Sequence, residues 1–195
     1  MQILFTESPT SLDNKLKPLR AVILGFGVVG SRRYKILRDL DVVEIKAISE
    51  KKTENLSSLP TNISKYQDYK DLLKNEEFEI VFVSLPNRFA SDATLLALES
   101  NAHVFCEKPP ARSSIELKPV LEYTFKHKDL KLMYGFNHRF HSSALMAKEI
   151  IESGELGQIV NMKGTYGKSK MITFNQTDWR SKREESGGGI LLDQG

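Results

Sequence analysis

A glycine-rich stretch near the start of the chain has the residue types and spacing that bind a dinucleotide. Residues 25–30 read G-F-G-V-V-G and directly follow the apolar run of residues 19–24. In the pattern G-x-G-x-x-G the first glycine permits a tight turn, and the second lets backbone approach a pyrophosphate. The third allows a helix to pack closely on a strand. We therefore expect a phosphate-binding turn at a helix N-terminus, made of Gly25, Phe26, Gly27, Val28, Val29 and Gly30.

An acidic residue follows this turn at the distance expected for ribose recognition. Glu50 closes the next alternating segment, twenty residues after Gly30. A carboxylate at this place can accept hydrogen bonds from the ribose hydroxyls and would repel a 2′-phosphate, which favours NAD over NADP. The neighbouring Ser49, Lys51 and Lys52 could instead bind such a phosphate, so NADP stays possible.

A second chemical stretch, F-C-E-K-P-P-A at residues 105–111, places an acid and a base directly after an apolar run. Ligands of open α/β sheets sit outside the carboxyl ends of the strands, so Glu107 and Lys108 are expected to face a cleft there. Pro109 favours an extended backbone at Lys108. A lysine beside a cofactor can exchange protons near neutral pH. The alternative is a surface salt bridge between Glu107 and another lysine.

Segments with the patterns of strands and of helices alternate along the chain, and these elements must position the residues described above. Their order predicts an α/β fold, a Rossmann-type doubly wound parallel sheet. Residues 51–64 are polar and are expected to form a loop. Ser113 and Glu116 have the spacing of a capping box, but Pro119 means that the helix either bends or starts later. The expected strands are residues 19–24, 42–48, 79–85, 103–106 and 131–136, and the expected helices are residues 28–40, 68–74 and 89–98.

The pattern changes after residue 141, which divides the chain into three parts. Residues 1–18 are a polar N-terminal extension, and residues 19–141 form the dinucleotide-binding domain. Residues 142–195 are expected to be the incomplete start of an α+β domain with an antiparallel sheet. That part begins with a helix at residues 144–151 and a strand at residues 159–167.

Composition narrows the function classes. The 195 residues carry a net charge of only +3, spread along the chain, so no nucleic-acid partner is expected. Cys106 is the single cysteine and lies in an apolar run, which indicates a buried thiol in a reducing compartment. No apolar run near the N-terminus is long enough for a signal peptide or a membrane span, so we expect a cytoplasmic protein without a membrane partner. His138 and His141 lack a third ligand at matching spacing, so no metal is expected.

Several motifs in this order resemble the Gfo/Idh/MocA oxidoreductases, which include glucose–fructose oxidoreductase and inositol dehydrogenase. The resemblance covers about residues 19–195. One position departs from it, because Ala90 stands where members often carry a histidine. The motifs are G-F-G-V-V-G, S-L-P-N at 84–87, C-E-K-P at 106–109, G-F-N-H-R-F-H at 135–141, E-S-G-E-L-G-Q-I at 152–159, D-W-R at 178–180 and G-G-G-I-L-L-D-Q-G at 187–195.

The resemblance implies transfer of a hydride between a nicotinamide and a hydroxyl-bearing carbon of a sugar, cyclitol or nucleotide-sugar. It implies catalytic roles for Lys108 and Asp193, and a full-length homo-oligomer built through the C-terminal sheet. The family's histidine would come four residues after Asp193, beyond Gly195. The implied cofactor-binding residues beyond the turn and Glu50 are Ser84, Pro86, Asn87, Glu107 and Lys108. The implied substrate residues are Asn137, His138, Arg139, Trp179 and Arg180, with Trp179 alternatively filling a core.

Two other hypotheses stay open at this point. The chain could bind a dinucleotide without performing chemistry, or it could be an inactive fragment of a longer oxidoreductase. Residues 142–195 are too few for a sheet domain with its own core. We therefore expect the 195 residues to bind the cofactor without efficient turnover.

Overall fold

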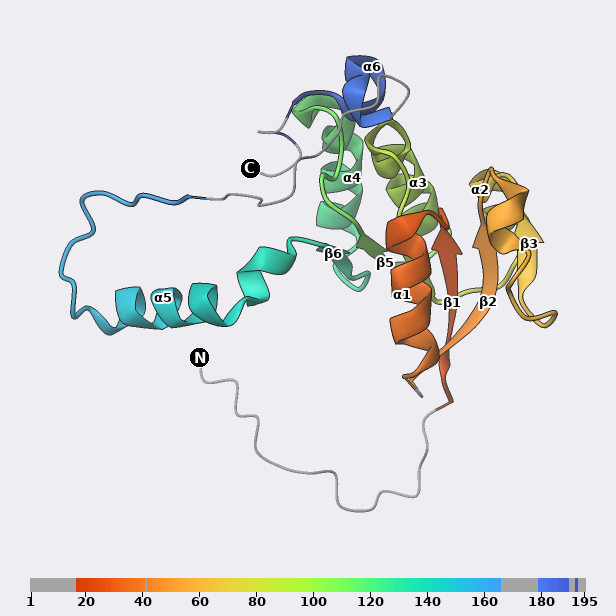
Figure 1. Ribbon diagram of the computed structural model, residues 1–195, viewed down its shortest axis with the longest axis horizontal. Helices are drawn as coiled ribbons and strands as arrows, with labels where there is room; N and C mark the ends of the chain where they lie inside the picture. Colours follow the sequence, from red (N-terminus) through yellow and green to blue (C-terminus); the bar gives the residue numbers. More distant parts are fainter. Residues whose placement is uncertain (1–16, 41, 166–178, 190–191, 193–195) are drawn as a thin grey trace, which may run out of the picture.

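The computed structural model describes residues 17–40, 42–165, 179–189 and 192. Within these residues six parallel strands form one sheet in the order β3-β2-β1-β4-β5-β6 (Figure 1). The strand order reverses between β1 and β4, as in doubly wound dinucleotide-binding folds. The predicted Rossmann-type sheet is therefore confirmed. The strands are β1 (Leu19–Leu24), β2 (Val43–Ser49), β3 (Ser64–Tyr66), β4 (Ile80–Val83), β5 (His103–Cys106) and β6 (Leu132–Tyr134).

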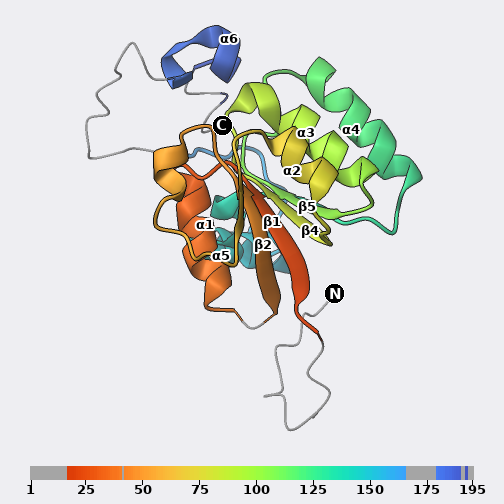
Figure 2. The same cartoon turned by 90° about the vertical axis from the view of Figure 1, so that its right-hand side faces the viewer.

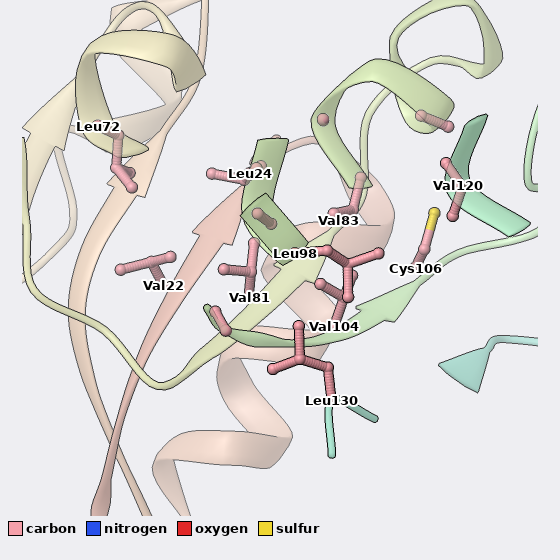
Figure 3. Packing of buried hydrophobic residues seen from close by; sticks show 14 of the residues in the cluster. Val22, Leu24, Leu72, Val81, Val83, Leu98, Val104, Cys106, Val120 and Leu130 are labelled. Carbon is pink, nitrogen blue, oxygen red and sulfur yellow. The ribbon is translucent and has the colours of Figure 1, made fainter. Parts of the chain in front are cut away.

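Helices cover both faces of the sheet because its central strands are apolar on both sides. Leu37 of α1 packs with Ala21 and Ile23 on one face. Side chains of α2, α3 and α4 pack with Val22 and Leu24 on the other (Figures 2 and 3). The helices are α1 (Val28–Arg38), α2 (Tyr69–Asn75), α3 (Asn87–Glu99), α4 (Ser114–Lys126), α5 (Ser142–Ser153) and α6 (Arg183–Ser186), with 3₁₀ turns η1 (Thr53–Leu56), η2 (Asn137–Phe140) and η3 (Trp179–Ser181).

The capping box correctly locates the start of α4. The hydroxyl of Ser113 accepts a hydrogen bond from the backbone N–H of Glu116, at 3.3 Å. Pro119 lies inside the helix, which continues through it to Lys126. Val120 is fully buried beside this proline. The helix therefore starts where the box predicts. Pro119 removes one backbone hydrogen bond from it, and the packing of Val120 helps to stabilise the helix despite this loss.

Two secondary-structure predictions are wrong. Residues 51–64, expected to be a loop, contain η1 and the first residue of β3. β3 has only three residues and no apolar run, and it forms by pairing with β2. The strand expected at residues 159–167 is absent from residues 159–165, and its last two residues lie outside the described part. No strand lies beside this segment among the described residues, so its backbone has no ladder to join.

Helix α5, with which the second part of the chain begins, lies away from the sheet. This helix extends away from the sheet (Figure 1), and apolar side chains such as Met146 and Ile150 are exposed on it. After α5, the described residues contain no strand of the expected antiparallel sheet. Of the N-terminal extension, residues 1–16 lie outside the described part, and Lys17 and Pro18 are exposed. None of the described helices is long and apolar enough to span a membrane.

The single cysteine is buried, as predicted. Cys106 ends β5 with no exposed surface, and burial raises the pKa of its thiol to about 12. In the unfolded chain the thiol would lose its proton near the ordinary value of 9.0. Above that pH the unfolded state binds fewer protons than the folded state. The free energy of unfolding therefore falls as pH rises from 9.0 toward 12.

We predict a measurable pH effect from this thiol. Between pH ~8 and ~10, Cys106 should lower the free energy of unfolding by about 1.4 kcal/mol. Urea unfolding at both pH values would measure the loss, and a Cys106→Ala variant would provide the control because it lacks the ionisable group. Equal pH dependence in the two proteins would contradict this account of Cys106.

Candidate functional site

The glycine turn between β1 and α1 depends on two of its three glycines for packing. Gly25 has a φ of +89°, and a Cβ there would lie 2.5 Å from the carbonyl oxygen of Ser84. A Cβ on Gly30 would overlap the carbonyl oxygen of Gly25. The backbone N–H of Gly25 also donates to the carbonyl of Ser49 at 2.9 Å. The turn is therefore pressed against the carboxyl ends of β2 and β4.

The remaining glycine lies beside open space. A Cβ on Gly27 would meet nothing within 4 Å. Gly27 is the N-cap of α1, with no side-chain cap and no acidic residue in the first turn of the helix. The N–H groups of this turn can therefore point to an anion that approaches the backbone closely. Val28 and Val29 are exposed beside them, whereas Phe26 is buried against Tyr34 and presents only its backbone.

Glu50 is fixed in front of this turn. One of its carboxylate oxygens accepts the backbone N–H of Phe26 at 2.8 Å, and the other accepts the N–H of Lys52 at 3.0 Å. Each oxygen can accept a further hydrogen bond, so the carboxylate remains able to bind ribose hydroxyls. A pyrophosphate at the open helix N-terminus and a ribose at Glu50 fit this arrangement. The turn and the acid predicted from the sequence are thus brought together.

The alternative NADP site loses one of its three residues. Ser49 is only 2% exposed, and its hydroxyl finds no hydrogen-bond partner in the described chain. The buried hydroxyl cannot reach a phosphate bound outside the protein. The prediction that Ser49 could help bind a 2′-phosphate is therefore wrong. Lys51 and Lys52 are exposed and keep that possibility.

Three residues predicted to contact the cofactor follow β4 at the same edge of the sheet. Ser84 donates its N–H to the carbonyl of Leu24 at 2.7 Å and packs against the glycine turn. Pro86 is the N-cap of α3. Asn87 is buried, and its side-chain amide donates to the carbonyl of Ser186 at 2.8 Å. Asn87 therefore contacts the second part of the chain, a role that its position after a strand did not predict.

Asn87 belongs to a set of contacts that we call the α3–α6 contact. It comprises Asn87, Arg88 and Arg112 of the first domain and residues 184–187 of the second part. Arg88 forms an ion pair with Glu185, and the Arg112 guanidinium donates to the carbonyl of Glu184. The contact holds α6 near the carboxyl ends of the strands (Figures 1 and 2).

Arg112 is the central member of this contact. Its guanidinium also binds the carboxylate of Glu116, which lowers the pKa of that acid below its ordinary value. Gly187 has a φ of +84° and lies so close to Arg112 that a Cβ would overlap that side chain. The first glycine of the G-G-G motif is therefore required by this packing. The i,i+4 spacing of Arg112 and Glu116 was the one sequence signal that could have revealed Arg112.

Glu107 pairs with an arginine rather than with the lysine considered from the sequence. Its carboxylate binds the guanidinium of Arg33 on α1, and the two side chains are only 15% and 21% exposed. The surface salt bridge with a lysine was therefore wrong in both partner and place. Lys108 follows directly, is partly exposed, and has a cis peptide bond to Pro109.

The residues expected to bind substrate fall into two groups. Asn137, His138 and Arg139 lie in η2, which begins three residues after β6, and they are exposed. Trp179 and Arg180 lie in η3, where the Arg180 guanidinium stands 4.4 Å from the centre of the partly exposed Trp179 ring. Asp193 lies outside the described residues, so its catalytic role stays a prediction. Among the described residues, no group of three His, Cys, Asp or Glu side chains could hold a metal.

Family models match both parts of the chain. A model described as "Oxidoreductase family, NAD-binding Rossmann fold" matches residues 19–136, where the turn, Glu50 and Lys108 lie. A second, the GFO/IDH/MocA C-terminal domain, matches residues 144–195.

The chain belongs to the Gfo/Idh/MocA oxidoreductase family.

Related proteins of this family have similar sequences and folds. Inositol 2-dehydrogenase of Salmonella typhimurium is 30% identical over 82% of this chain and 49% of its own length. D-glucoside 3-dehydrogenase of Escherichia coli is 32% identical over 91% of this chain and 51% of its own length. The crystal structure of myo-inositol 2-dehydrogenase from Lactobacillus plantarum superposes with a TM-score of 0.67 at 28% identity, covering 74% of this chain and 44% of that one. The chain spans about half the length of these curated relatives.

Proposed function

We propose that this chain carries the cofactor site and the Lys108 centre of an NAD-dependent oxidoreductase. The proposed reaction transfers a hydride between the nicotinamide and a hydroxyl-bearing carbon of a sugar, cyclitol or nucleotide-sugar. One observation carries the proposal. Three features lie at the carboxyl edge of one sheet: the open helix N-terminus at Gly27, the fixed Glu50 carboxylate, and the adjacent residues Glu107 and Lys108. The inositol and glucoside dehydrogenases related to the chain support the substrate class.

Each part of this edge has a distinct task. The backbone around Gly27 binds the pyrophosphate, and Glu50 accepts hydrogen bonds from the adenosine ribose. When bound, the nicotinamide accepts or supplies the hydride. Lys108 accepts the hydroxyl proton as the substrate carbon becomes a carbonyl, and it returns that proton in the reverse direction. Asp193 is the proposed second catalytic residue.

Substrate contacts are assigned to the ends of neighbouring elements. Asn137, His138 and Arg139 follow β6, which pairs with β5, the strand that leads to Lys108. Trp179 and Arg180 come from η3, whose neighbour α6 contacts α3. Arg139 and Arg180 would favour an anionic group on the substrate.

The proposed protein is a homo-oligomer in the cytoplasm. The exposed apolar side chains of α5 support self-association, and a single, buried cysteine supports a reducing compartment.

An assay of NADH formation tests the proposed reaction. The chain would be incubated with NAD and, separately, with myo-inositol, glucosides and nucleotide-sugars, while NADH binding is titrated by fluorescence. NADH binding is expected together with slow but measurable turnover of at least one polyol, because efficient turnover is not expected of these 195 residues. Binding without turnover of any of them would contradict the proposed reaction and favour a dinucleotide-binding protein that performs no chemistry.

We predict that Glu50 determines the cofactor preference. NADH should bind more tightly than NADPH, and Glu50→Ala should weaken NADH binding by about tenfold, because charge-assisted hydrogen bonds to the ribose are lost. NADPH binding should change less, so the preference narrows. Calorimetric titration of both cofactors measures this.

Glu54→Ala provides the control for this prediction. Glu54 is an exposed acid of η1, four residues after Glu50 in the sequence. None of its carboxylate contacts in the described structure involves the glycine turn. Its replacement should leave the affinities for both cofactors unchanged. Tighter binding of NADPH by the unaltered chain would mean that Lys51 and Lys52, rather than Glu50, decide the preference.

A further inference from the structure

A sheltered ion pair joins the phosphate-binding helix to the residue before Lys108. Arg33 comes from the second turn of α1, and Glu107 is the first residue after β5. Their side chains meet across 74 positions of sequence and are about four-fifths buried. A charge pair so protected from water is screened much less than a pair at the surface. The pair therefore links the two functional stretches that the sequence keeps apart.

Three neighbours hold this pair in one geometry. The guanidinium of Arg33 stands 4.3 Å from the centre of the Phe105 ring, which favours a cation over an aromatic face. Phe105 in turn packs beside Phe82, with ring centres 6.0 Å apart. A Cβ on the buried Gly135 would lie 2.9 Å from a carboxylate oxygen of Glu107. The carboxylate thus occupies a fixed space between α1 and the end of β6.

The backbone of Glu107 is held as well. Its N–H donates to the carbonyl of Val83 at 2.9 Å, and the N–H of Gly135 donates to the carbonyl of Cys106 at 2.8 Å. Main chain and side chain therefore both determine where the chain lies immediately before Lys108. We propose that Arg33 is a positioning residue that orients Lys108 through Glu107, an inference that rests on the proposed function of Lys108.

Removing the guanidinium leaves the sheltered Glu107 carboxylate unpaired, so Glu107 must move toward water or toward another cation. Lys108 is the next residue, and it moves with the backbone or is drawn to the free carboxylate. Either change displaces its amine. A displacement of about 1 Å at a catalytic group can lower kcat by about 10²-fold. Cofactor binding depends mainly on Gly27 and Glu50, so it should change little.

The test combines two measurements on Arg33→Gln, with Arg32→Gln as the matched control because Arg32 is the exposed neighbour on the same helix. The first is the rate of reductive methylation of the Lys108 amine, followed by mass spectrometry of the peptide that contains it. This rate needs no turnover. Arg33→Gln should change it by about tenfold, the effect of one charge-assisted hydrogen bond, and Arg32→Gln should leave it unchanged.

The second measurement is kinetic. With a substrate found in the assay above, Arg33→Gln should lower kcat by about 10²-fold, while the dissociation constant of NADH stays within about twofold. A folded Arg33→Gln chain with normal methylation of Lys108 overturns the proposal. If no protein, including the unaltered chain, turns over a polyol, the proposed function fails, and the methylation rate still decides the role of Arg33.

A conservative variant covers the case in which Arg33→Gln does not fold. Arg33→Lys keeps a positive charge opposite Glu107 but loses the planar group that stacks on Phe105. We expect it to fold, which circular dichroism would verify, and to change the methylation rate of Lys108 by about threefold, in the same direction as Arg33→Gln. An unchanged rate in the folded Arg33→Lys chain also overturns the proposal.

Discussion

Replacing Lys108 by alanine is expected to lower kcat by about 10²–10⁴-fold, the usual contribution of a general acid or base. Lys108 follows β5 at the carboxyl edge of the sheet, where it can exchange a proton with the substrate hydroxyl. Lys108→Arg should be nearly as slow, because a guanidinium keeps the charge but does not release its proton near neutral pH. The affinity for NADH should change far less. Steady-state rates of NADH formation and a fluorescence titration would measure both effects.

Lys118→Ala is the matched control for this prediction. Lys118 is an exposed lysine of α4, and its ion pair with Glu122 spans 3.7 Å. An exposed pair of this kind contributes little, so the variant should keep the original kcat. Survival of turnover within a few-fold in Lys108→Ala would mean that Lys108 is structural and that another group moves the proton.

The second large effect is expected from the glycine turn, where two similar substitutions should act in different ways. Gly30→Ala places a methyl group against the carbonyl of Gly25, which belongs to the backbone and cannot rotate away. We expect a loss of about 1–3 kcal/mol of stability, the range for overpacking, with weaker NADH binding. Gly27→Ala places its methyl group in open space. It should leave stability nearly unchanged and weaken NADH binding by about tenfold, because the pyrophosphate can no longer approach the backbone.

Thermal unfolding and NADH titration separate the two outcomes. Gly164→Ala serves as the control, since a Cβ at Gly164 also meets nothing within 4 Å and the residue lies outside the turn. It should change neither quantity. Normal NADH affinity in Gly27→Ala would place the pyrophosphate elsewhere and refute the assigned turn.

Features encoded by neighbouring residues were predictable from the sequence. The start of α4 depends on a contact between Ser113 and Glu116, and the glycine turn is marked by the spacing of its own three glycines, so the local pattern alone reveals both. Glu50 was found because it closes the alternating segment that follows the helix, twenty residues after Gly30. In each case the spacing along the chain nearly fixes the spacing in the fold.

Features that need distant parts of the chain were missed. β3 becomes a strand through pairing with β2, and its three residues carry no apolar pattern of their own. The Arg33–Glu107 pair spans 74 positions, and Asn87 meets Ser186 across 99 positions. A charged residue in a helix is predicted to be solvent-exposed unless its partner is known. No local sequence pattern therefore indicated the role of Arg33, although its side chain joins the two functional stretches.

The α3–α6 contact has a thermodynamic consequence for cofactor affinity. It lies at the edge of the sheet where the dinucleotide is proposed to bind, and Asn87 comes four residues after the end of β4, the strand next to β1. If docking of residues 184–187 changes cofactor affinity by some factor, the cofactor must change the docking equilibrium by the same factor, because such coupling is reciprocal. A substitution of Arg88 or Arg112 that loosens this contact would then alter NADH affinity, although neither residue is assigned a contact with the cofactor. The affinity of the first domain for NADH would thus depend in part on residues 184–187, which belong to the second part of the chain.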